Sequence, residues 1–183
     1  RLNQWHFDAG ITEVTCLLPA DDLRLAISAN GIDKNAVANK AGRLLESILD
    51  YMAKRIECPL PYKDDGFTLG DLLPAVIGIG TRFKSGIKND ASKDLPENWT
   101  DLRPLIQTVY EWANVRNLVG AHFNLEGANL SERDVMEFGN MVLDLHSKLV
   151  CPQCGEMVRR DTGSLWECRC RRFCVMPLKY KTG

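Results

Sequence analysis

The C-terminal part of the sequence is dominated by closely spaced cysteines. Five of the seven cysteines lie within 151–183, and the first two form the sequence Cys151-Pro-Gln-Cys154-Gly. Two thiolates separated by two residues can bind one tetrahedral ion, and the glycine that follows permits the tight turn between them. A segment this short cannot bury a sufficient core of its own, so a bound metal would have to stabilise it. The spacing therefore predicts a small metal-bound ribbon at 150–183.

A closed tetrahedral site needs four ligands, whereas this segment offers five cysteines. We expect the ligands to be Cys151, Cys154, Cys168 and Cys170. The stretch Trp166–Cys170 is typical of a strand that enters a turn, which favours this choice. Cys174 is an alternative to Cys168 or Cys170, or else a buried thiol. Because every ligand would be a thiolate, no position is left for water, and we expect a structural Zn²⁺ ion.

Upstream of the cysteines, apolar residues recur every three or four positions, which is typical of amphipathic helices. The longest such stripe comprises Val37, Ala41, Leu44, Leu45, Ile48, Leu49, Met52 and Ile56. Asp33 or Asn35 would cap this helix, and Pro59 would prevent its continuation. Shorter helices are expected over 68–79, from about Thr100 onward, and after Ser131. The sequence thus predicts a mainly α protein with a small β ribbon.

The last predicted helix has the most regular pattern. Ser131 and Asp134 resemble a capping box, in which the two side chains satisfy the first free amides of the helix. The apolar stripe that follows comprises Val135, Phe138, Val142, Leu145 and Leu149. This stripe can be buried inside the domain or against a second copy of the chain, and the pattern alone leaves both alternatives open. His146, near the end of the helix, is expected to be a surface residue.

These patterns divide the chain into three parts. Residues 1–32 contain a strand-like stretch at 11–17 and a short predicted helix at 21–29, and we expect them to be the trailing end of an upstream region that packs on the helices. Residues 33–149 form the helical domain, with a polar surface loop at 82–98, and 150–183 form the ribbon. Because the chain begins with Arg1, we expect it to be part of a longer protein.

Charge and cysteine usage narrow the function classes. Residues 151–183 carry seven Lys and Arg against three acids, whereas 1–150 carry 16 basic and 21 acidic residues. A basic cap on an acidic body is typical of a protein that contacts nucleic acid. Clustered cysteines favour a reducing cytoplasm over disulfides. No apolar run approaches the length of a membrane span, so we expect no membrane partner.

One short motif combines the groups needed to cleave RNA without a metal. In Trp112–Asn124, Arg116 and Asn117 are adjacent and His122 follows. An imidazole can transfer a proton near neutral pH, a guanidinium can bind a phosphate and stabilise its developing charge, and an amide can orient either group. Arg116 also continues the apolar stripe of the predicted helix that precedes it, where a charged side chain needs a partner or an anion.

The order Arg116-Asn117, four residues, His122, late in a helix of an all-helical domain, resembles the RN-x4-H motif of HEPN ribonucleases. The resemblance covers this motif and a helical frame over about 34–149, and it implies a HEPN-like helical bundle. It further implies a metal-independent endoribonuclease in which the ribose 2′-OH attacks the phosphorus and a 2′,3′-cyclic phosphate forms. A homodimer, a toxin or anti-phage role, and an upstream sensor or ATPase region are also implied.

Two other interpretations stay open. Arg, Asn and His near the end of a helix are also what C-terminal capping favours. Six residues of an ideal helix turn by about 240°, so Arg116 and His122 would share a site only if the helix bends or ends near Gly120, or if a second copy completes it. The alternative function is a non-catalytic module for dimerisation and nucleic-acid docking.

Overall fold

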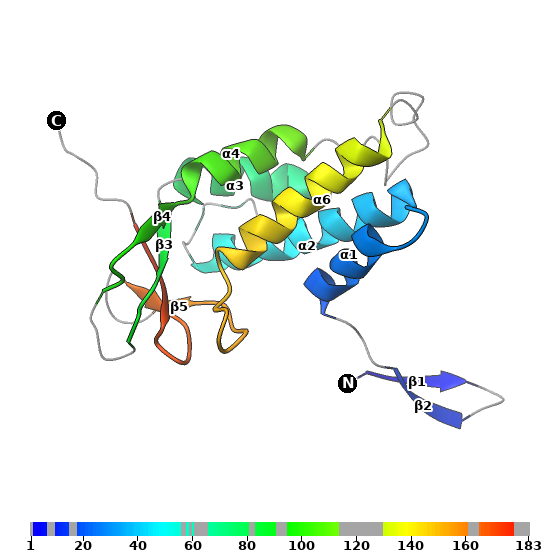
Figure 1. The fold of residues 1–183 in the computed structure, drawn as a ribbon, viewed down its shortest axis with the longest axis horizontal. Helices are drawn as coiled ribbons and strands as arrows, with labels where there is room; N and C mark the ends of the chain where they lie inside the picture. Colours follow the sequence, from blue (N-terminus) through cyan, green and yellow to red (C-terminus); the bar gives the residue numbers. More distant parts are fainter. Residues whose placement is uncertain are drawn as a thin grey trace.

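The computed structural model describes residues 2–6, 10–14, 18–55, 58, 60, 66–80, 83–90, 95–113, 130–160 and 165–177. Over these residues the protein is mainly α, with a five-stranded antiparallel sheet at one end of the helical body and a separate two-stranded hairpin near the N-terminus (Figure 1). The expectation of a mainly α protein with short β elements is therefore confirmed. Among the described helices, none combines the length and apolar character that a membrane span requires.

Helices and strands are interspersed along the chain. The described helices are α1 (Pro19–Ser28), α2 (Lys34–Arg55), α3 (Leu69–Gly80), α4 (Arg103–Trp112) and α6 (Glu132–Ser147). The described strands are β1 (Leu2–His6), β2 (Gly10–Val14), β3 (Phe83–Ile87), β4 (Trp99–Asp101), β5 (Arg159–Arg160), β6 (Trp166–Glu167) and β7 (Phe173–Pro177).

Helix α2 is the centre of the helical body and packs against α1, α3 and α6 (Figure 1). Its buried side chains are Val37, Ala38, Ala41, Leu44, Leu45, Ile48, Leu49, Met52 and Ala53. The carboxylate of Asp33 accepts hydrogen bonds from the amides of Asn35 and Ala36, at 2.9 and 3.1 Å. The predicted cap is thus confirmed with Asp33 as the capping residue. The predicted apolar stripe faces the core from Val37 to Met52, and its last member, Ile56, lies outside the described residues.

Helix α6 buries the regular stripe that the sequence predicts. Ser131 and Asp134 form a complete capping box, with the Asp134 amide donating to Ser131 and the Ser131 amide donating to Asp134. The stripe packs against α2 within one chain, which decides between the two alternatives left open by the pattern. A Cβ atom on Gly139 would lie 2.8 Å from Cδ1 of Ile27, so glycine permits the close approach of α1.

Helix α4 begins later than the sequence predicts. Thr100 lies in β4, and the helix starts at Arg103, where the carboxylate of Asp101 accepts a hydrogen bond from the Arg103 amide at 3.0 Å. Only Leu102 separates β4 from α4, and its amide donates to the carbonyl of Phe83 in β3 at 3.1 Å. Ile106, Val109 and Ala113 are buried as expected.

The small sheet corrects the prediction of a surface loop at 82–98. Phe83–Ile87 is a strand near the middle of a five-stranded antiparallel sheet with the order β4-β3-β7-β6-β5. Its neighbours are β4, which follows it closely, and β7, which comes about 90 residues later. The sheet thus joins a strand from the predicted helical domain to strands from the predicted ribbon. Local polarity could not reveal this strand, because its partner is distant in sequence.

Gly86 shows how tightly the rest of this loop packs on the sheet. A Cβ atom at this position would lie 2.7 Å from the carbonyl oxygen of Asn98 and 2.8 Å from Cβ of Pro96. Both Gly86 and Pro96 are buried. The loop after β3 therefore folds back over its own strand, and only a residue without a side chain allows the contact.

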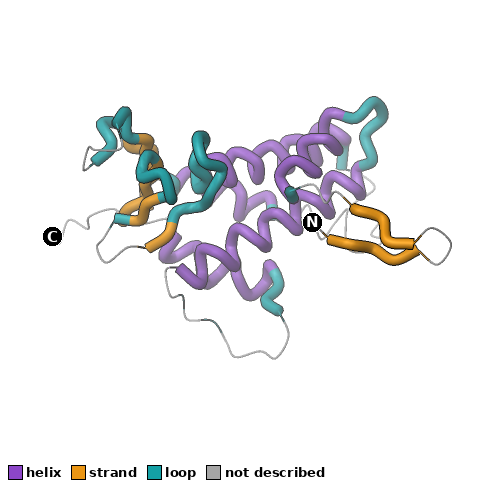
Figure 2. The backbone as a smooth tube through the Cα atoms, turned by 90° about the horizontal axis from the view of Figure 1, so that it is seen from below, coloured by secondary structure: helices purple, strands orange, loops and turns teal. Residues whose placement is uncertain are grey.

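The N-terminal elements agree with the predicted strand and short helix. Strands β1 and β2 form an antiparallel hairpin with Leu2 opposite Val14 and His6 opposite Gly10. Helix α1 packs against α2 and α6, whereas the hairpin projects beyond the helices (Figures 1 and 2). Among the described residues of 1–32, α1 and Ile32 pack against the helical body.

Candidate metal centre

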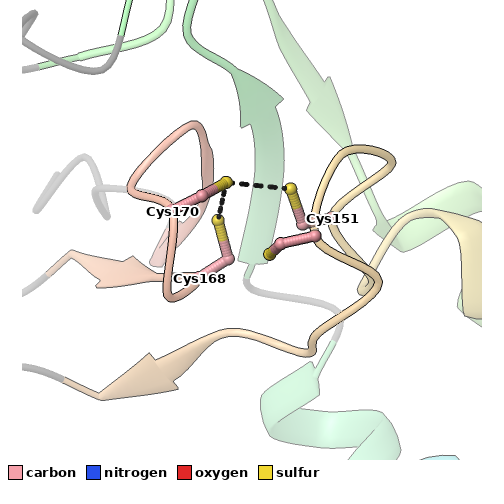
Figure 3. A group of neighbouring side chains, drawn as sticks. Cys151, Cys168 and Cys170 are labelled. Atoms are coloured by element: carbon pink, nitrogen blue, oxygen red, sulfur yellow. Dashed lines mark hydrogen bonds between the residues drawn. The ribbon is translucent and has the colours of Figure 1, made fainter.

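Two turns of the ribbon bring four cysteines together. The Sγ atoms of Cys151, Cys154, Cys168 and Cys170 all lie within 4.8 Å of one another. Figure 3 shows the sulfurs of Cys151, Cys168 and Cys170 pointing toward one another from separate turns. These are the four cysteines that the sequence predicts as ligands, and together they can hold a metal ion.

The first turn is a short hairpin closed by main-chain hydrogen bonds. An antiparallel bridge joins Val150 to Met157, and the Cys151 amide donates to the carbonyl of Glu156 at 3.0 Å. The Gly155 amide donates back to the carbonyl of Cys151 at 2.9 Å. Gly155 has a φ of +67°, a left-handed conformation that glycine adopts at little cost. This confirms the expected role of the glycine that follows the Cys-x-x-Cys pair.

The second turn connects β6 to β7 and holds Cys168 and Cys170. The Arg171 amide donates to the carbonyl of Cys168 at 2.9 Å, and the Cys168 amide donates to the carbonyl of Phe173 at 2.9 Å. The Phe173 amide also donates to Sγ of Cys168 at 3.2 Å. Arg171 has a φ of +61°, which is strained for a residue with a side chain. The conformation of this turn thus brings the sulfurs of Cys168 and Cys170 close together.

The distances between the sulfurs fit a tetrahedral thiolate site. Sγ of Cys170 lies 3.5 Å from Sγ of Cys151 and 3.4 Å from Sγ of Cys168. A metal–sulfur bond of about 2.3 Å implies tetrahedral sulfurs about 3.8 Å apart, whereas a disulfide would bring two sulfurs to about 2.05 Å. All four thiols are free. The arrangement therefore suits one ion bound between two knuckles.

Burial of the sulfurs disfavours thiolates that no cation compensates. Burial raises the pKa of the Cys151 thiol to about 12, and it raises the pKa of Cys168 as well. The Glu156 amide, by donating a hydrogen bond, lowers the pKa of Cys154 to about 7. Cys151 and Cys168 are almost fully buried, so their thiolates would be costly without a cation. A bound divalent metal removes this cost and deprotonates the thiols outright.

The fifth cysteine of the ribbon is a buried thiol outside the cluster. Cys174 lies in β7 with no exposed surface, and its Sγ is 3.9 Å from a carboxylate oxygen of Glu167. Burial raises the pKa of this thiol to about 11. Of the alternatives left open by the sequence, the buried thiol is the one that this geometry favours.

A buried ion pair connects the metal centre to the rest of the sheet. Nζ of Lys88, at the end of β3, lies 2.5 Å from a carboxylate oxygen of Glu167 in β6. The Lys88 amide also donates to the carbonyl of Arg172 at 2.7 Å. This lysine could not be recognised from the sequence, because it lies in a polar stretch and its partner is 79 positions away. Its position after a strand that pairs with β7 becomes visible only in the fold.

Aromatic packing supports the same junction. The rings of Phe83 in β3 and Trp166 in β6 are 5.0 Å apart between centroids. Both side chains belong to the buried core, together with Phe173 and Val175 of β7. The ribbon therefore shares its core with β3, and the metal site is attached to the helical body through this shared core.

The structure does not describe the predicted catalytic residues. Arg116, Asn117 and His122 lie outside the described residues, which stop at Ala113 and resume at Leu130. What precedes them is described: α4 ends at Trp112, and Ala113 is buried at its C-terminus. Their convergence on one site stays a prediction.

His146 is the described histidine with a perturbed environment. It is half-buried at the C-terminal end of α6, rather than the surface residue that was expected. Burial lowers the pKa of its imidazole, and the nearby Arg24 lowers it further, while Asp21 opposes the shift. Together with α1 and the first cysteine turn, it lines a cavity of about 460 Å³.

Comparisons with protein-family models, with curated proteins and with solved structures found no match.

Proposed function

We propose that the ribbon binds one structural Zn²⁺ ion and that the chain as a whole is a metal-independent endoribonuclease. The zinc assignment is supported by a donor set of four thiolates, which zinc favours and which leaves no coordination position for water or substrate. The ion would supply folding free energy to the ribbon and take no part in the reaction. The observation that carries the nuclease assignment is the sequence motif Arg116-Asn117 with His122.

Each residue of the motif has a role that its chemistry permits. The substrate 2′-OH would attack the adjacent phosphorus, with His122 as general base or acid for the proton that moves. Arg116 would bind the scissile phosphate and stabilise the charge that develops on its oxygens, and Asn117 would position these groups. Two copies of the chain would bring two such motifs to one cleft, and a sensor or ATPase region of the same protein would control them.

The second candidate is a non-catalytic module that docks on nucleic acid through the ribbon. It is favoured by the side chains of Arg169 and Arg171, which are 79% and 70% exposed beside the metal centre. Within the described part of the chain, Arg169 donates a hydrogen bond to Glu156 at 3.3 Å and Arg171 lies 3.5 Å from Glu167. Because both side chains are largely exposed, their guanidinium groups can reach phosphates. This reading uses the same fold and needs no chemistry at His122.

Incubation of the zinc-bound protein with RNA in a buffer without added Mg²⁺ or other divalent metal separates the two candidates. The nuclease predicts cleavage that leaves a 2′,3′-cyclic phosphate, and loss of His122 or Arg116 should slow it by about 10²–10⁴-fold. The variants are His122→Ala and Arg116→Ala, with His146→Ala and Arg133→Ala as matched controls of the same residue types. Zinc content and circular dichroism, measured in parallel, show that the ribbon and the fold are intact.

Each outcome supports or excludes one of the two candidate functions. Cleavage that persists in His122→Ala and Arg116→Ala removes the site assignment. Binding of RNA without cleavage, weakened by Arg169→Ala together with Arg171→Ala, favours the docking module.

A further inference from the structure

A groove runs along the surface between α4 and α6, on the side of α6 that does not face α2. These two helices pack against each other (Figure 1). The groove has a volume of about 830 Å³. It is lined by Leu105, Ser131, Glu132, Arg133, Met136, Glu137, Asn140, Met141 and Asp144. It lies away from the cysteine cluster and shares no residue with it.

Helix α6 has a second stripe of side chains that forms one wall of this groove. Arg133, Met136, Glu137, Asn140, Met141 and Asp144 recur every three or four positions, next to the buried stripe described above. From Arg133 to Asp144 the stripe covers eleven residue steps, which at about 1.5 Å each is a length of about 17 Å. A groove of this length matches about three turns of a second helix.

The floor of the groove is apolar and adaptable. Leu105 of α4 and Met136 and Met141 of α6 are each only partly buried within the chain. Methionine side chains are unbranched and polarisable, and they adjust to apolar partners of different shape. Partly exposed methionines in a groove are a feature of surfaces that receive amphipathic helices.

The rim of the groove is acidic. Among the described lining residues, Glu132, Glu137 and Asp144 are acidic and Arg133 is the one cation, which gives them a net charge of −2. Glu132 and Glu137 are exposed and form no ion pair with other described residues. Asp144 uses its Oδ1 atom to accept a hydrogen bond from Oγ of Ser147 at 3.3 Å and to contact Nζ of Lys148 at 3.8 Å. These carboxylates are therefore available to a positively charged partner.

We propose that this groove docks an amphipathic helix of a partner protein, with an apolar stripe flanked by lysine and arginine. The apolar stripe would cover Leu105, Met136 and Met141, and the basic residues would lie against Glu137 and Asp144. Charge complementarity decides the occupant. A second copy related by a two-fold axis would bring two acidic rims together, and a nucleic acid would be repelled by the same carboxylates. The proposal does not depend on the nuclease assignment.

Fluorescence anisotropy with two designed peptides tests this. The probe is a labelled helical peptide of about three to four turns, with leucine every third or fourth position and lysine elsewhere. The control peptide has glutamate in place of each lysine. We expect saturable binding of the lysine peptide only, weakened by added salt because the rim charges are exposed.

Protein variants locate the binding. Charge reversal with Glu137→Lys and Asp144→Lys together should lower the affinity for the lysine peptide by about tenfold, since two attractions become repulsions. The double variant Met136→Ala with Met141→Ala should also weaken binding of the lysine peptide, because it removes apolar contacts at the floor of the groove. Glu111→Lys is the matched control, because Glu111 is an exposed acid on α4 outside the groove, and it should leave the affinity within about twofold.

Several results overturn the proposal. These are no binding of the lysine peptide, equal binding of both peptides, or equal loss in the control and in the double charge reversal. A dimer detected by sedimentation that dissociates on Met141→Lys would assign the groove to a second copy instead. Circular dichroism confirms that each variant is folded.

Discussion

Nζ of Lys88 lies 2.5 Å from a carboxylate oxygen of Glu167, although the two residues are 79 positions apart in the chain. The Lys88 side chain is 1% exposed and that of Glu167 is 14% exposed. The pair joins the end of β3 to β6, next to Cys168. The metal ribbon is therefore held to the helical body by a buried charge pair as well as by shared strands.

Replacing Lys88 should destabilise this junction strongly. Lys88→Met leaves Glu167 buried without its main partner, and we expect the free energy of unfolding to fall by about 2–4 kcal/mol. The control is Lys84→Met, because Lys84 lies 4.6 Å from the ring centroid of Trp99 and should contribute about 1 kcal/mol or less. Urea denaturation measures both. The double variant Lys88→Met with Glu167→Leu should recover much of the loss, and an equal effect of Lys88→Met and the control would contradict the structural role.

The cysteine cluster predicts a metal stoichiometry. We expect about one zinc ion per chain by elemental analysis, lost in Cys151→Ser because a serine hydroxyl is a poor zinc ligand. Cys174→Ser is the matched control, since this thiol is buried in the same sheet but lies outside the cluster. Chelation should lower the melting temperature, because metal binding to the folded ribbon contributes folding free energy. A fully folded protein without metal would refute the site.

Because the chain packs closely over β3 at Gly86, we expect even a methyl side chain there to lower the free energy of unfolding. In Gly86→Ala the new Cβ would lie under 3 Å from Asn98 and Pro96, so the loop must shift, and we expect a loss of about 1–3 kcal/mol. Gly66→Ala is the control, because nothing lies within 4 Å of a Cβ at that position. Thermal unfolding of the two variants makes the comparison. A neutral Gly86→Ala would mean that the loop does not lie on the strand.

The lowered pKa of the His146 imidazole predicts how the stability of the protein depends on pH. Its pKa in the folded protein lies below the ordinary value of 6.5, first because of burial and then because of Arg24. The unfolded chain therefore binds the proton more tightly, and stability should fall as the pH drops from above 6.5 through the lower pKa of the folded state. Below that pKa the loss is complete. Stability curves of the protein and of His146→Gln from pH 8 to 5 should diverge in this window, and parallel curves would exclude the contribution.

Features that depend on neighbouring residues could be predicted from the sequence. The cap at Asp33, the capping box of Ser131 with Asp134, and the buried stripes of α2 and α6 all follow from spacings of three and four residues. Cys151 and Cys154 identified the first knuckle for the same reason. Choosing Cys168 and Cys170 over Cys174 rested on the strand pattern around Trp166, which the structure bears out.

Features that depend on distant pairing could not be predicted. The stretch Phe83–Ile87 is short and interrupted by Gly86, and nothing near it indicates that β7 will pair with it. Lys88 appears as one more surface charge until Glu167 is placed beside it. The RN-x4-H motif is visible in the sequence, but the relative position of Arg116 and His122 depends on backbone geometry that spacing does not specify.

The sequence by itself determined the stripes of α2 and α6, the capping box of Ser131 with Asp134 and the turn that holds Cys151 and Cys154, because each of these is decided by interactions within a few turns of chain. Only the tertiary structure decided that the ribbon and the helical body share one sheet and one core. Such pairing depends on which surfaces meet after collapse, and hydrogen bonds between strands are equally available to many partners until burial of Phe83, Trp166 and Lys88 selects one.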